Sequence, residues 1–350
     1  MFLRALATAV PKNAYTQREC WKIAENSPHL ATLSRRSRLT LNSILTHDRG
    51  IDKRHFAVPA VERLFDLTPD ELSHAFRATA PQLACDALIP AIEAARIRPS
   101  EIDALLICTC TGYLCPGLTS YVSETLGLRN NAFLQDLVGL GCGAAIPTLR
   151  SASHLLGADP DATVACVAVE VCSAAFYLDD DPGVLVSACL FGDGAAATIW
   201  SGRAGPGRFR CFGFQTLHLP GDRDKLRFET RHGKLRNLLD RTVPELAAGA
   251  ASRLWSERGP RPVSRIVAHA GGPDVLSALS SAFPAHSLES SARILRDFGN
   301  MSSPSVLFAL EETLRDCDPG SEGDFWLVSF GAGFSAHACR LGLPGEGGLG

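Results

Sequence analysis

Apolar residues in the first half of the chain form two kinds of run, one with helical spacing and one nearly continuous. Recurrence at every third or fourth position predicts amphipathic helices, at residues 60–97, 117–126 and 144–156. Unbroken apolar runs predict strands that are buried on both faces, at residues 102–111, 132–138 and 162–171. Their alternation predicts an α/β fold, with a largely parallel sheet that carries helices on both faces.

The second half repeats this alternation. After a β-rich stretch at 206–228, we predict helices at 234–255, 274–279 and 303–314, and strands at 264–268 and 325–329. Two pairs of segments are similar: GLGCGAAIPTLRSA with FGNMSSPSVLFAL, and CLFGDGAAATIW with VSFGAGFSAHAC. Because the members of each pair lie about 150 residues apart, they predict an internal duplication. The Gly/Pro-rich stretch 202–207 is the expected boundary, which divides the chain into halves 1–205 and 206–350.

The composition excludes several classes of protein. Hydrophobic residues make up 46% of the 350 residues and the formal net charge is −3, which is not the composition of a disordered chain. The chain lacks the basic excess of a general nucleic-acid binder. It also lacks an apolar run of the roughly 18 residues that span a membrane. Its first ten residues are too short an apolar stretch for a signal peptide, so we expect a cytoplasmic protein.

Twelve cysteines are present, and most of them fit the interior of a protein in a reducing compartment. Five lie within apolar runs, where cysteine acts as a small hydrophobic residue: Cys108, Cys110, Cys166, Cys172 and Cys189. No C-x-x-C spacing occurs, so neither a zinc ribbon nor a thioredoxin-type site is expected.

Cys142 has different surroundings from the other cysteines. It lies between Gly141 and Gly143, where a helix is predicted to begin. Free backbone N–H groups and the helix dipole favour a thiolate at such a position. Cys142 is therefore a candidate nucleophile, and a packing cysteine in a tight turn is the alternative.

His269 and Asn300 are candidate partners for this nucleophile. His269 follows the predicted strand 264–268 and precedes a Gly-Gly turn, a position from which a side chain can project into a cleft. The alternative for His269 is a core histidine. Asn300 precedes the predicted helix 303–314, where it is either a cap or turn residue or an amide donor. Together the two side chains could form an oxyanion hole for a thioester enolate.

Five segments occur in an order and spacing that is specific when they are taken together. They are the Cys142 loop, HAGGP at 269–273, GNMSSPSVLF at 299–308, FGDGAAA at 191–197 and FGAGF at 330–334. On these segments the chain resembles the type III polyketide synthases, the chalcone synthase-like enzymes, from about residue 40 to about residue 342. The resemblance implies a thiolase-like αβαβα layered fold of two duplicated halves, a homodimer, and a reaction without cofactor or metal.

The resemblance also implies a mechanism. Cys142 would attack an acyl-CoA starter and hold it as a thioester. His269 would pair with the thiolate and then, with Asn300, stabilise the enolate that malonyl-CoA forms when it loses carbon dioxide. Attack of this enolate on the thioester would lengthen the chain by two carbons, and the poly-β-keto product would cyclise.

Further positions follow from the same resemblance. Phe191 and Phe228 occupy the positions of two gatekeeping phenylalanines, and Ser302 that of a pocket residue. Arg49 and Lys53 match basic positions that hold CoA phosphates, which suits their charge. A solvated cluster of charges is the alternative for these two residues.

Several residues differ from those of the plant chalcone synthases, and these differences bear on which starter the enzyme accepts. Cys110, Cys172 and Ala175 replace threonines, and Gly143 replaces a phenylalanine, which removes hydroxyls and bulk near the cavity. These changes favour an aliphatic starter and resemble bacterial alkylresorcinol and alkylpyrone synthases. Leu219 replaces a glycine, and because leucine is larger, this change reduces the expected volume of the cavity.

Four alternatives remain open from the sequence. The first is a synthase of alkylresorcinols or alkylpyrones from a fatty acyl-CoA and malonyl-CoA. The second makes a tetrahydroxynaphthalene-like aromatic from malonyl-CoA alone. A β-ketoacyl-ACP synthase of the initiating kind would carry a His-Gln-Ala-Asn-type motif where this chain has HAGGP. A non-catalytic homologue should have lost Cys142, His269 or Asn300, and all three are present.

Overall fold

The computed structural model describes residues 1–59, 61–204, 209–316 and 323–343. In this part of the chain the largest sheet has nine strands in the order β11-β12-β13-β8-β1-β7-β6-β4-β5. Their bounds are β1 Phe2–Ala9, β4 Ala104–Cys108, β5 Phe133–Leu137, β6 Thr163–Glu170, β7 Gly194–Ser201, β8 Arg210–Arg223, β11 Val263–Ala268, β12 Asp324–Gly331 and β13 Gly333–Gly342. Strands β1 and β8 are joined through one register pair, Phe2 with Arg210, so the sheet consists of two half-sheets that meet at this edge.

The two half-sheets repeat one pattern. Outward from their junction, one contains β1, β7, β6 and β4, and the other contains β8, β13, β12 and β11. In each, the first two pairings are antiparallel and the third is parallel. The repetition agrees with the predicted duplication. The predicted boundary between residues 205 and 206 lies outside the described residues.

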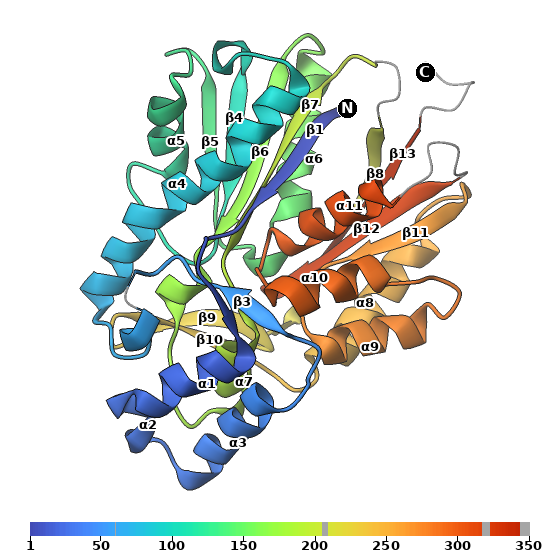
Figure 1. Ribbon diagram of the computed structural model, residues 1–350. Helices are drawn as coiled ribbons and strands as arrows, with labels where there is room; N and C mark the ends of the chain where they lie inside the picture. The colour runs from blue at the N-terminus through green and yellow to red at the C-terminus, as the bar shows by residue number, and fades with distance from the viewer. Residues whose placement is uncertain (60, 205–208, 317–322, 344–350) are drawn as a thin grey trace.

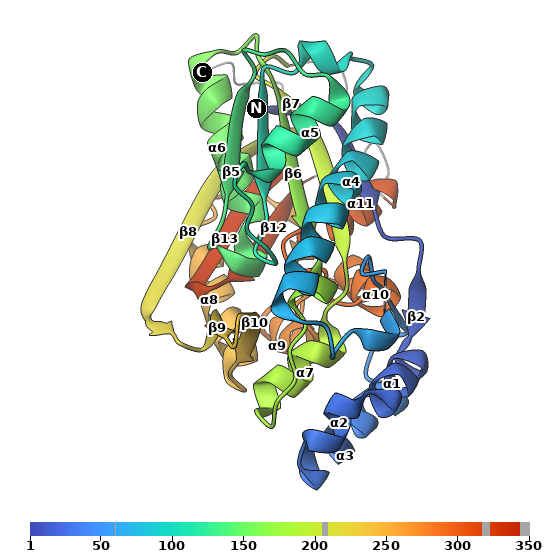
Figure 2. The same cartoon turned by 90° about the vertical axis from the view of Figure 1, so that its left-hand side faces the viewer.

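Helices and half-sheets alternate in five layers. The outer helices α4 (Pro69–Ala95) and α5 (Leu118–Leu126) pack on the first half-sheet, as Figures 1 and 2 show. Helix α8 (Val243–Ser256), with α9 (Pro273–Ala282) beside it, packs on the second. Between the half-sheets lie α6 (Ala145–Ala158) and α11 (Ser305–Arg315), which contact strands of both. The layered α/β fold predicted from the sequence is therefore confirmed.

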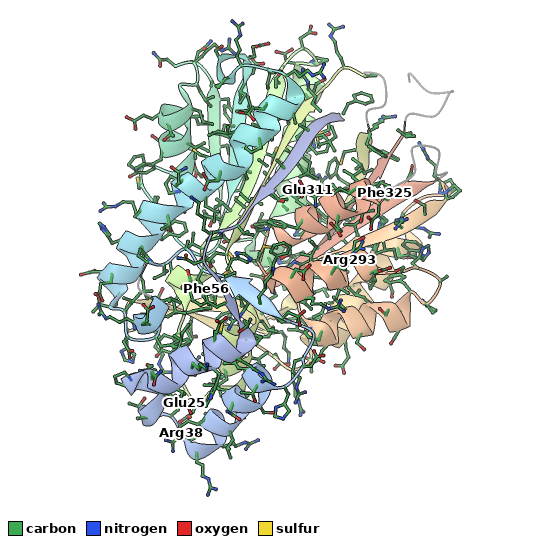
Figure 3. All side chains as sticks on the ribbon, viewed as in Figure 1. Glu25, Arg38, Phe56, Arg293, Glu311 and Phe325 are labelled. Atoms are coloured by element: carbon green, nitrogen blue, oxygen red, sulfur yellow. The ribbon has the colours of Figure 1, made fainter. Side chains whose placement is uncertain are left out.

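Helix α11 shows how the middle layer is attached to both half-sheets. Glu311 of this helix, labelled in Figure 3, accepts a hydrogen bond of 2.8 Å from the Thr8 hydroxyl of β1. On its other side the helix contacts β11 and β12 of the second half-sheet. Each half-sheet contains one fully buried tryptophan, Trp200 on β7 and Trp326 on β12.

The prediction of a largely parallel sheet is wrong. In the described sheet only the pairs β4–β5, β4–β6 and β11–β12 are parallel. A continuous apolar run indicates that both faces of a strand are buried. The helical layers bury both faces whether neighbouring strands are parallel or antiparallel. Direction depends on the connections, and the turn at Ala332 joins β12 directly to β13 as an antiparallel hairpin.

The predicted helix at 234–255 is wrong in its first third. Residues Lys234–Leu239 form β10, which pairs with β9 (Leu226–Arg231) in a hairpin, and α8 begins only at Val243. The turn residues His232 and Gly233 have φ of 51° and 75°, respectively. Two successive residues with positive φ match the twist of a tight β-hairpin. The spacing of apolar residues, which we interpreted as helical, did not reveal this turn.

A group of short elements lies outside the layers, at the lower end of the molecule in Figure 1. It includes α1 Gln17–Asn26, α2 Pro28–Thr32, α3 Arg35–Thr46, α7 Pro182–Leu190, the β2–β3 pair (Ala14–Thr16 with Lys53–His55) and the β9–β10 hairpin. Helix α10 (Glu289–Phe298) packs between α11 and β3. None of the described helices combines the length and apolarity needed to cross a membrane.

Candidate active site

The loop that carries Cys142 is held against the turn between β12 and β13. A short turn of helix, Gly141–Gly143, follows β5 and leads into α6. Gly141 has φ of 58°, and a Cβ atom there would lie 3.0 Å from the backbone nitrogen of Ala332. Glycine therefore allows this close approach, which places Cys142 in the interior with 7% of its surface exposed.

His269 is placed by the end of β11. Its backbone N–H donates to the carbonyl of Val328 at 2.8 Å, and its own carbonyl accepts from Gly271 N–H at 2.8 Å. The side chain is buried, and Nδ1 has no hydrogen-bond partner among the described residues. Burial lowers the pKa of the imidazole to about 4, so His269 is neutral at pH 7.

Asn300 is held by a backbone bridge to the end of α7. Its N–H donates to Leu190 O at 2.9 Å, and its carbonyl accepts from Gly192 N–H at 3.0 Å. The side-chain Oδ1 accepts from Ser302 N–H at 2.7 Å, while Nδ2 donates to Gly271 O at 3.0 Å. These bonds fix the orientation of the amide and connect it to the turn that follows His269.

One cavity brings these three residues together. We call it the front cavity; its volume is about 720 Å³, and Cys142, His269, Asn300 and Phe191 all line it. This volume lies within the roughly 300–1,000 Å³ that is typical of small-molecule sites. Arg49, which we predicted to contact CoA, also lines the cavity. Lys53 is exposed on β3 and is not among the described residues that line it.

Phe191 separates the front cavity from a smaller space. This inner pocket of about 20 Å³ is bordered by Phe191 and by four more of the predicted pocket residues, Cys172, Ala175, Phe228 and Ser302. The position between two spaces is that expected of a gatekeeper. Leu219, on β8, lines none of the described cavities and packs against the core instead.

The electrostatics of Cys142 differ from the prediction. The helix start was expected to favour a thiolate, but burial raises the pKa of the thiol to about 12. Desolvation of the charged form outweighs the helix dipole at this depth. The Ser302 hydroxyl, 3.2 Å from Sγ, acts in the opposite direction because its hydrogen bond stabilises the thiolate.

Glu170 is a buried residue of the site that the sequence analysis did not single out. Its carboxylate accepts hydrogen bonds from Thr111 Oγ1 at 2.8 Å, Ser303 Oγ at 2.6 Å and Cys110 N–H at 2.9 Å. Burial raises the pKa of this carboxyl, against these hydrogen bonds. Its signal in the sequence was a single charged residue near the end of the apolar run 162–171.

The layered fold is shared with thiolase-fold condensing enzymes of known structure. The crystal structure of 1,3,6,8-tetrahydroxynaphthalene synthase from Streptomyces coelicolor A3(2), a bacterial type III polyketide synthase, superimposes with a TM-score of 0.87. It is 26% identical in sequence, and the match covers 97% of this chain and 99% of that chain.

Matches to family models and to individual relatives identify the kind of condensing enzyme. Residues 12–209 match the family described as FAE1/Type III polyketide synthase-like protein, and residues 262–339 match the C-terminal domain of chalcone and stilbene synthases. The chain belongs to the type III polyketide synthase family, and it is an acyltransferase-type condensing enzyme.

Individual relatives differ in the product for which they are named. The 1,3,6,8-tetrahydroxynaphthalene synthase of Streptomyces peucetius subsp. caesius is 31% identical, over 96% of this chain and 92% of the relative. A 3,5-dihydroxyphenylacetyl-CoA synthase of Amycolatopsis orientalis is 29% identical, over 94% and 90%. An alpha-pyrone synthesis polyketide synthase-like protein of Mycobacterium tuberculosis is 26% identical, over 90% and 84%.

Proposed function

We propose that this enzyme loads a fatty acyl-CoA starter on Cys142, extends it with malonyl-CoA, and cyclises the product to an alkylresorcinol or alkylpyrone. The observation that carries the proposal is the convergence of Cys142, His269 and Asn300 on the front cavity. Arg49 lines the same cavity and supplies a cation for the phosphates of CoA.

The proposed chemistry has two stages. In the first, the Cys142 thiol passes its proton to neutral His269 as the sulfur attacks the starter thioester, and the imidazolium returns that proton to CoA, which leaves as its thiol. In the second, malonyl-CoA loses carbon dioxide, and the enolate is stabilised by the N–H of neutral His269 and by Asn300 Nδ2. A neutral imidazole suits this step because it donates a hydrogen bond without protonating the enolate. The low pKa of His269 supports that role.

A second candidate uses malonyl-CoA as both starter and extender and makes a small aromatic. Two observations favour it: the tetrahydroxynaphthalene synthases among the relatives, at 31% and 27% identity, and the inner pocket of only about 20 Å³. Both candidates use the same three catalytic residues and differ only in the starter.

We also propose a homodimer. Strand β5 is an edge of the nine-stranded sheet, and it exposes 50% of Phe133 and 38% of Leu134. Tyr113 and Val138, which flank the same edge, are also exposed. An apolar edge strand is open to pairing with another chain, and a second copy of this chain fits it. The eleven described cysteines are all free, which supports a cytoplasmic location.

Product mass spectrometry tests the proposal. Purified protein would receive malonyl-CoA with acetyl-, hexanoyl-, lauroyl- or palmitoyl-CoA, with Cys142→Ala as the control. Resorcinols or pyrones that lengthen with the starter are expected. One product from malonyl-CoA alone would establish the second candidate, and the absence of any Cys142-dependent product would refute both. Cys142→Ala should still decarboxylate some malonyl-CoA, because His269 and Asn300 remain.

A further inference from the structure

Two buried polar side chains of the inner pocket carry atoms without a partner. Ser187, on α7, and Asn237, on β10, both line this pocket, with 4% and 8% of their surfaces exposed. Within the described part of the chain, Ser187 Oγ and Asn237 Oδ1 have no hydrogen-bond partner. An unpaired buried polar atom costs free energy of folding, and such atoms are rare in native proteins. Two of them at one small pocket therefore indicate a ligand that supplies the missing partner.

The protein scaffold fixes these two side chains relative to each other. Helix α7 packs on β10. Gly183, in the first turn of α7, lies so close to the carbonyl of Leu239 that a Cβ atom there would overlap it. Beside Asn237, the side chain of Arg236 donates to Asp179 at 2.7 Å, just ahead of α7. The fold therefore shapes the pocket before a substrate enters, which lowers the entropic cost of binding.

The inner pocket has room for one small polar group. Its volume of about 20 Å³ exceeds the roughly 10–15 Å³ that a single water-sized group requires. Much of the remaining lining is apolar, including Phe176, Val184 and Ala188, so a hydrogen bond formed here is stronger than one in water. The Ser187 hydroxyl can donate, whereas Asn237 Oδ1 can only accept. The matching ligand group is an oxygen that accepts one hydrogen bond and donates another, as an enol does.

The inner pocket adjoins the nucleophile. Ser302 lines it, and Ser302 Oγ lies 3.2 Å from Cys142 Sγ. A poly-β-keto chain on Cys142 carries an oxygen at every second carbon. Such a ketone becomes an enol when a proton moves from the carbon between two carbonyls to one of the oxygens. Thr111 also lines the pocket but is already engaged, because its hydroxyl donates to Glu170 at 2.8 Å. The two unpaired atoms are therefore available to an oxygen of the growing chain.

We propose that Ser187 and Asn237 form an oxygen site for the growing poly-β-keto chain. Ser187 Oγ–H donates to an enol oxygen of the chain, and the O–H of the same enol donates to Asn237 Oδ1. This inference rests on the proposed function, in which the chain grows on Cys142, and it holds for either starter. A chain that is held at one oxygen is restrained from folding back on its thioester, so the site delays lactone closure until the final extension. Ser187 and Asn237 are therefore specificity residues for product length.

Substitutions that remove one partner at a time test the oxygen site. Ser187→Ala and Asn237→Ala each take away one partner of the enol. Ser187→Cys keeps the shape of the side chain but replaces the hydroxyl by a weak donor, so it separates loss of the hydrogen bond from gain of pocket volume. Ser252→Ala and Asn26→Ala are the matched controls, because both residues are exposed and line none of the described cavities. Each variant would receive malonyl-CoA and the starter that the unaltered enzyme accepts, with thermal melting as the check on folding.

Mass spectrometry would measure the ratio of the full-length product to shorter lactones. Loss of one hydrogen bond should lower this ratio about fivefold in Ser187→Ala, Ser187→Cys and Asn237→Ala, while the rate of carbon dioxide release stays the same. Because both partners hold one oxygen, the double variant of Ser187→Ala with Asn237→Ala should fall well short of the roughly 25-fold change that two independent contacts would give. The melting temperature of Ser187→Ala should not fall, because the substitution removes a buried hydroxyl that has no partner among the described residues.

The outcomes separate this inference from the proposed function. An unchanged product ratio in Ser187→Ala and Asn237→Ala would overturn the oxygen site and leave the proposed function intact. A change in Ser187→Ala that Ser187→Cys does not share would also overturn it, since pocket volume would then be the cause. A lower melting temperature of Ser187→Ala with a normal product ratio would do the same, because the pocket would then hold a structural water only. If Asn237→Ala fails to fold, the two Ser187 variants still decide. Absence of product from every starter in the unaltered enzyme would refute the proposed function itself.

Discussion

A single hydroxyl connects the nucleophile to the buried carboxylate of the site. Ser302 Oγ lies 3.2 Å from Cys142 Sγ and 3.3 Å from Glu170 Oε1. Because it carries one proton, it can donate to only one of them at a time. Glu170 already accepts from Thr111 and Ser303, which leaves the Ser302 proton available to the sulfur. Acylation of Cys142 removes the ionisable thiol, whose charged form this hydrogen bond stabilises.

Asn300 and Cys142 should separate the two stages of the reaction. In Asn300→Ala we expect malonyl-CoA decarboxylation to fall roughly 100-fold, the cost of losing one oxyanion donor. Starter loading, which needs the thiolate but not the enolate, should change by less than about fivefold by the same reasoning. Carbon dioxide release and the mass of the acylated protein measure the two stages. Equal losses in both, in a variant that melts like the unaltered protein, would contradict the oxyanion role of Asn300.

His269 should make stability depend on pH. Its pKa is about 4 in the folded protein against 6.5 in the unfolded chain, so the neutral form is favoured by folding. Its stabilising contribution is complete above pH 6.5 and is lost as the pH falls through about 4. Between pH 7 and pH 4.5 this one group should lower the free energy of unfolding by about 2–3 kcal/mol.

Urea unfolding at the two pH values, at one protein concentration, measures this loss. In His269→Gln, which cannot ionise, the decrease between pH 7 and pH 4.5 should be smaller by that amount. His74→Gln is the control, because His74 is exposed on α4. Parallel pH profiles for the unaltered protein and His269→Gln would show that the buried imidazole does not titrate as assigned.

At the level of elements, the guanidinium of Arg236 is one of the contacts that hold the β9–β10 hairpin against the segment before α7. Arg236 donates to Asp179 at 2.7 Å and to Glu229 at 2.9 Å, and it lies 3.4 Å from Asp181. The Arg236 side chain is 10% exposed, whereas the three carboxylates are between 22% and 38% exposed. The hairpin carries Phe228, which lines both the inner pocket and a cavity of about 540 Å³ between the first turns of α4 and the hairpin. Arg236 therefore contributes to the position of Phe228.

Arg236→Ala should lower the free energy of unfolding by about 1–3 kcal/mol, because it leaves three partly exposed carboxylates without their buried counter-ion. Arg231→Ala is the matched control: Arg231 contacts the same Asp179 at 3.4 Å but is 50% exposed, and its loss should cost about 1 kcal/mol or less. Denaturant unfolding measures both, and limited proteolysis should cut the hairpin first in Arg236→Ala. Equal effects of the two substitutions would contradict the importance of the buried guanidinium.

At the level of the whole molecule, the exposed edge at β5 should decide the oligomeric state. The double substitution Phe133→Glu and Leu134→Lys introduces charges into the proposed interface. Dimerisation would then have to remove these charges from water, so the dimer should become a monomer. Light scattering after gel filtration gives the mass directly. Ile89→Lys is the control, since Ile89 is 41% exposed on α4 and away from this edge. A monomer in the unaltered protein would refute the proposed dimer.

Local patterns were sufficient for the elements with regular periodicity. The apolar runs at 102–111 and 162–171 correspond to β4 and β6, and the helical spacing before them corresponds to α4. Helix α4 begins at Pro69 rather than near residue 60, because Thr68 caps it and Glu71 completes the capping box. The β10 strand was missed because its pairing with β9 is a contact between segments, which the spacing of apolar residues does not encode.

The sequence by itself determined the family, the layered α/β class, and the motifs that contain Cys142, His269 and Asn300. These depend on residue identity and short-range spacing, which the chain carries before it folds. The tertiary structure decided the strand directions, the burial that raises the pKa of Cys142, and the enclosure of Glu170. It also decided that Leu219 lies away from the cavities and that a further cavity opens behind Cys110. Desolvation and cavity shape depend on which distant segments pack together, so they exist only in the folded chain.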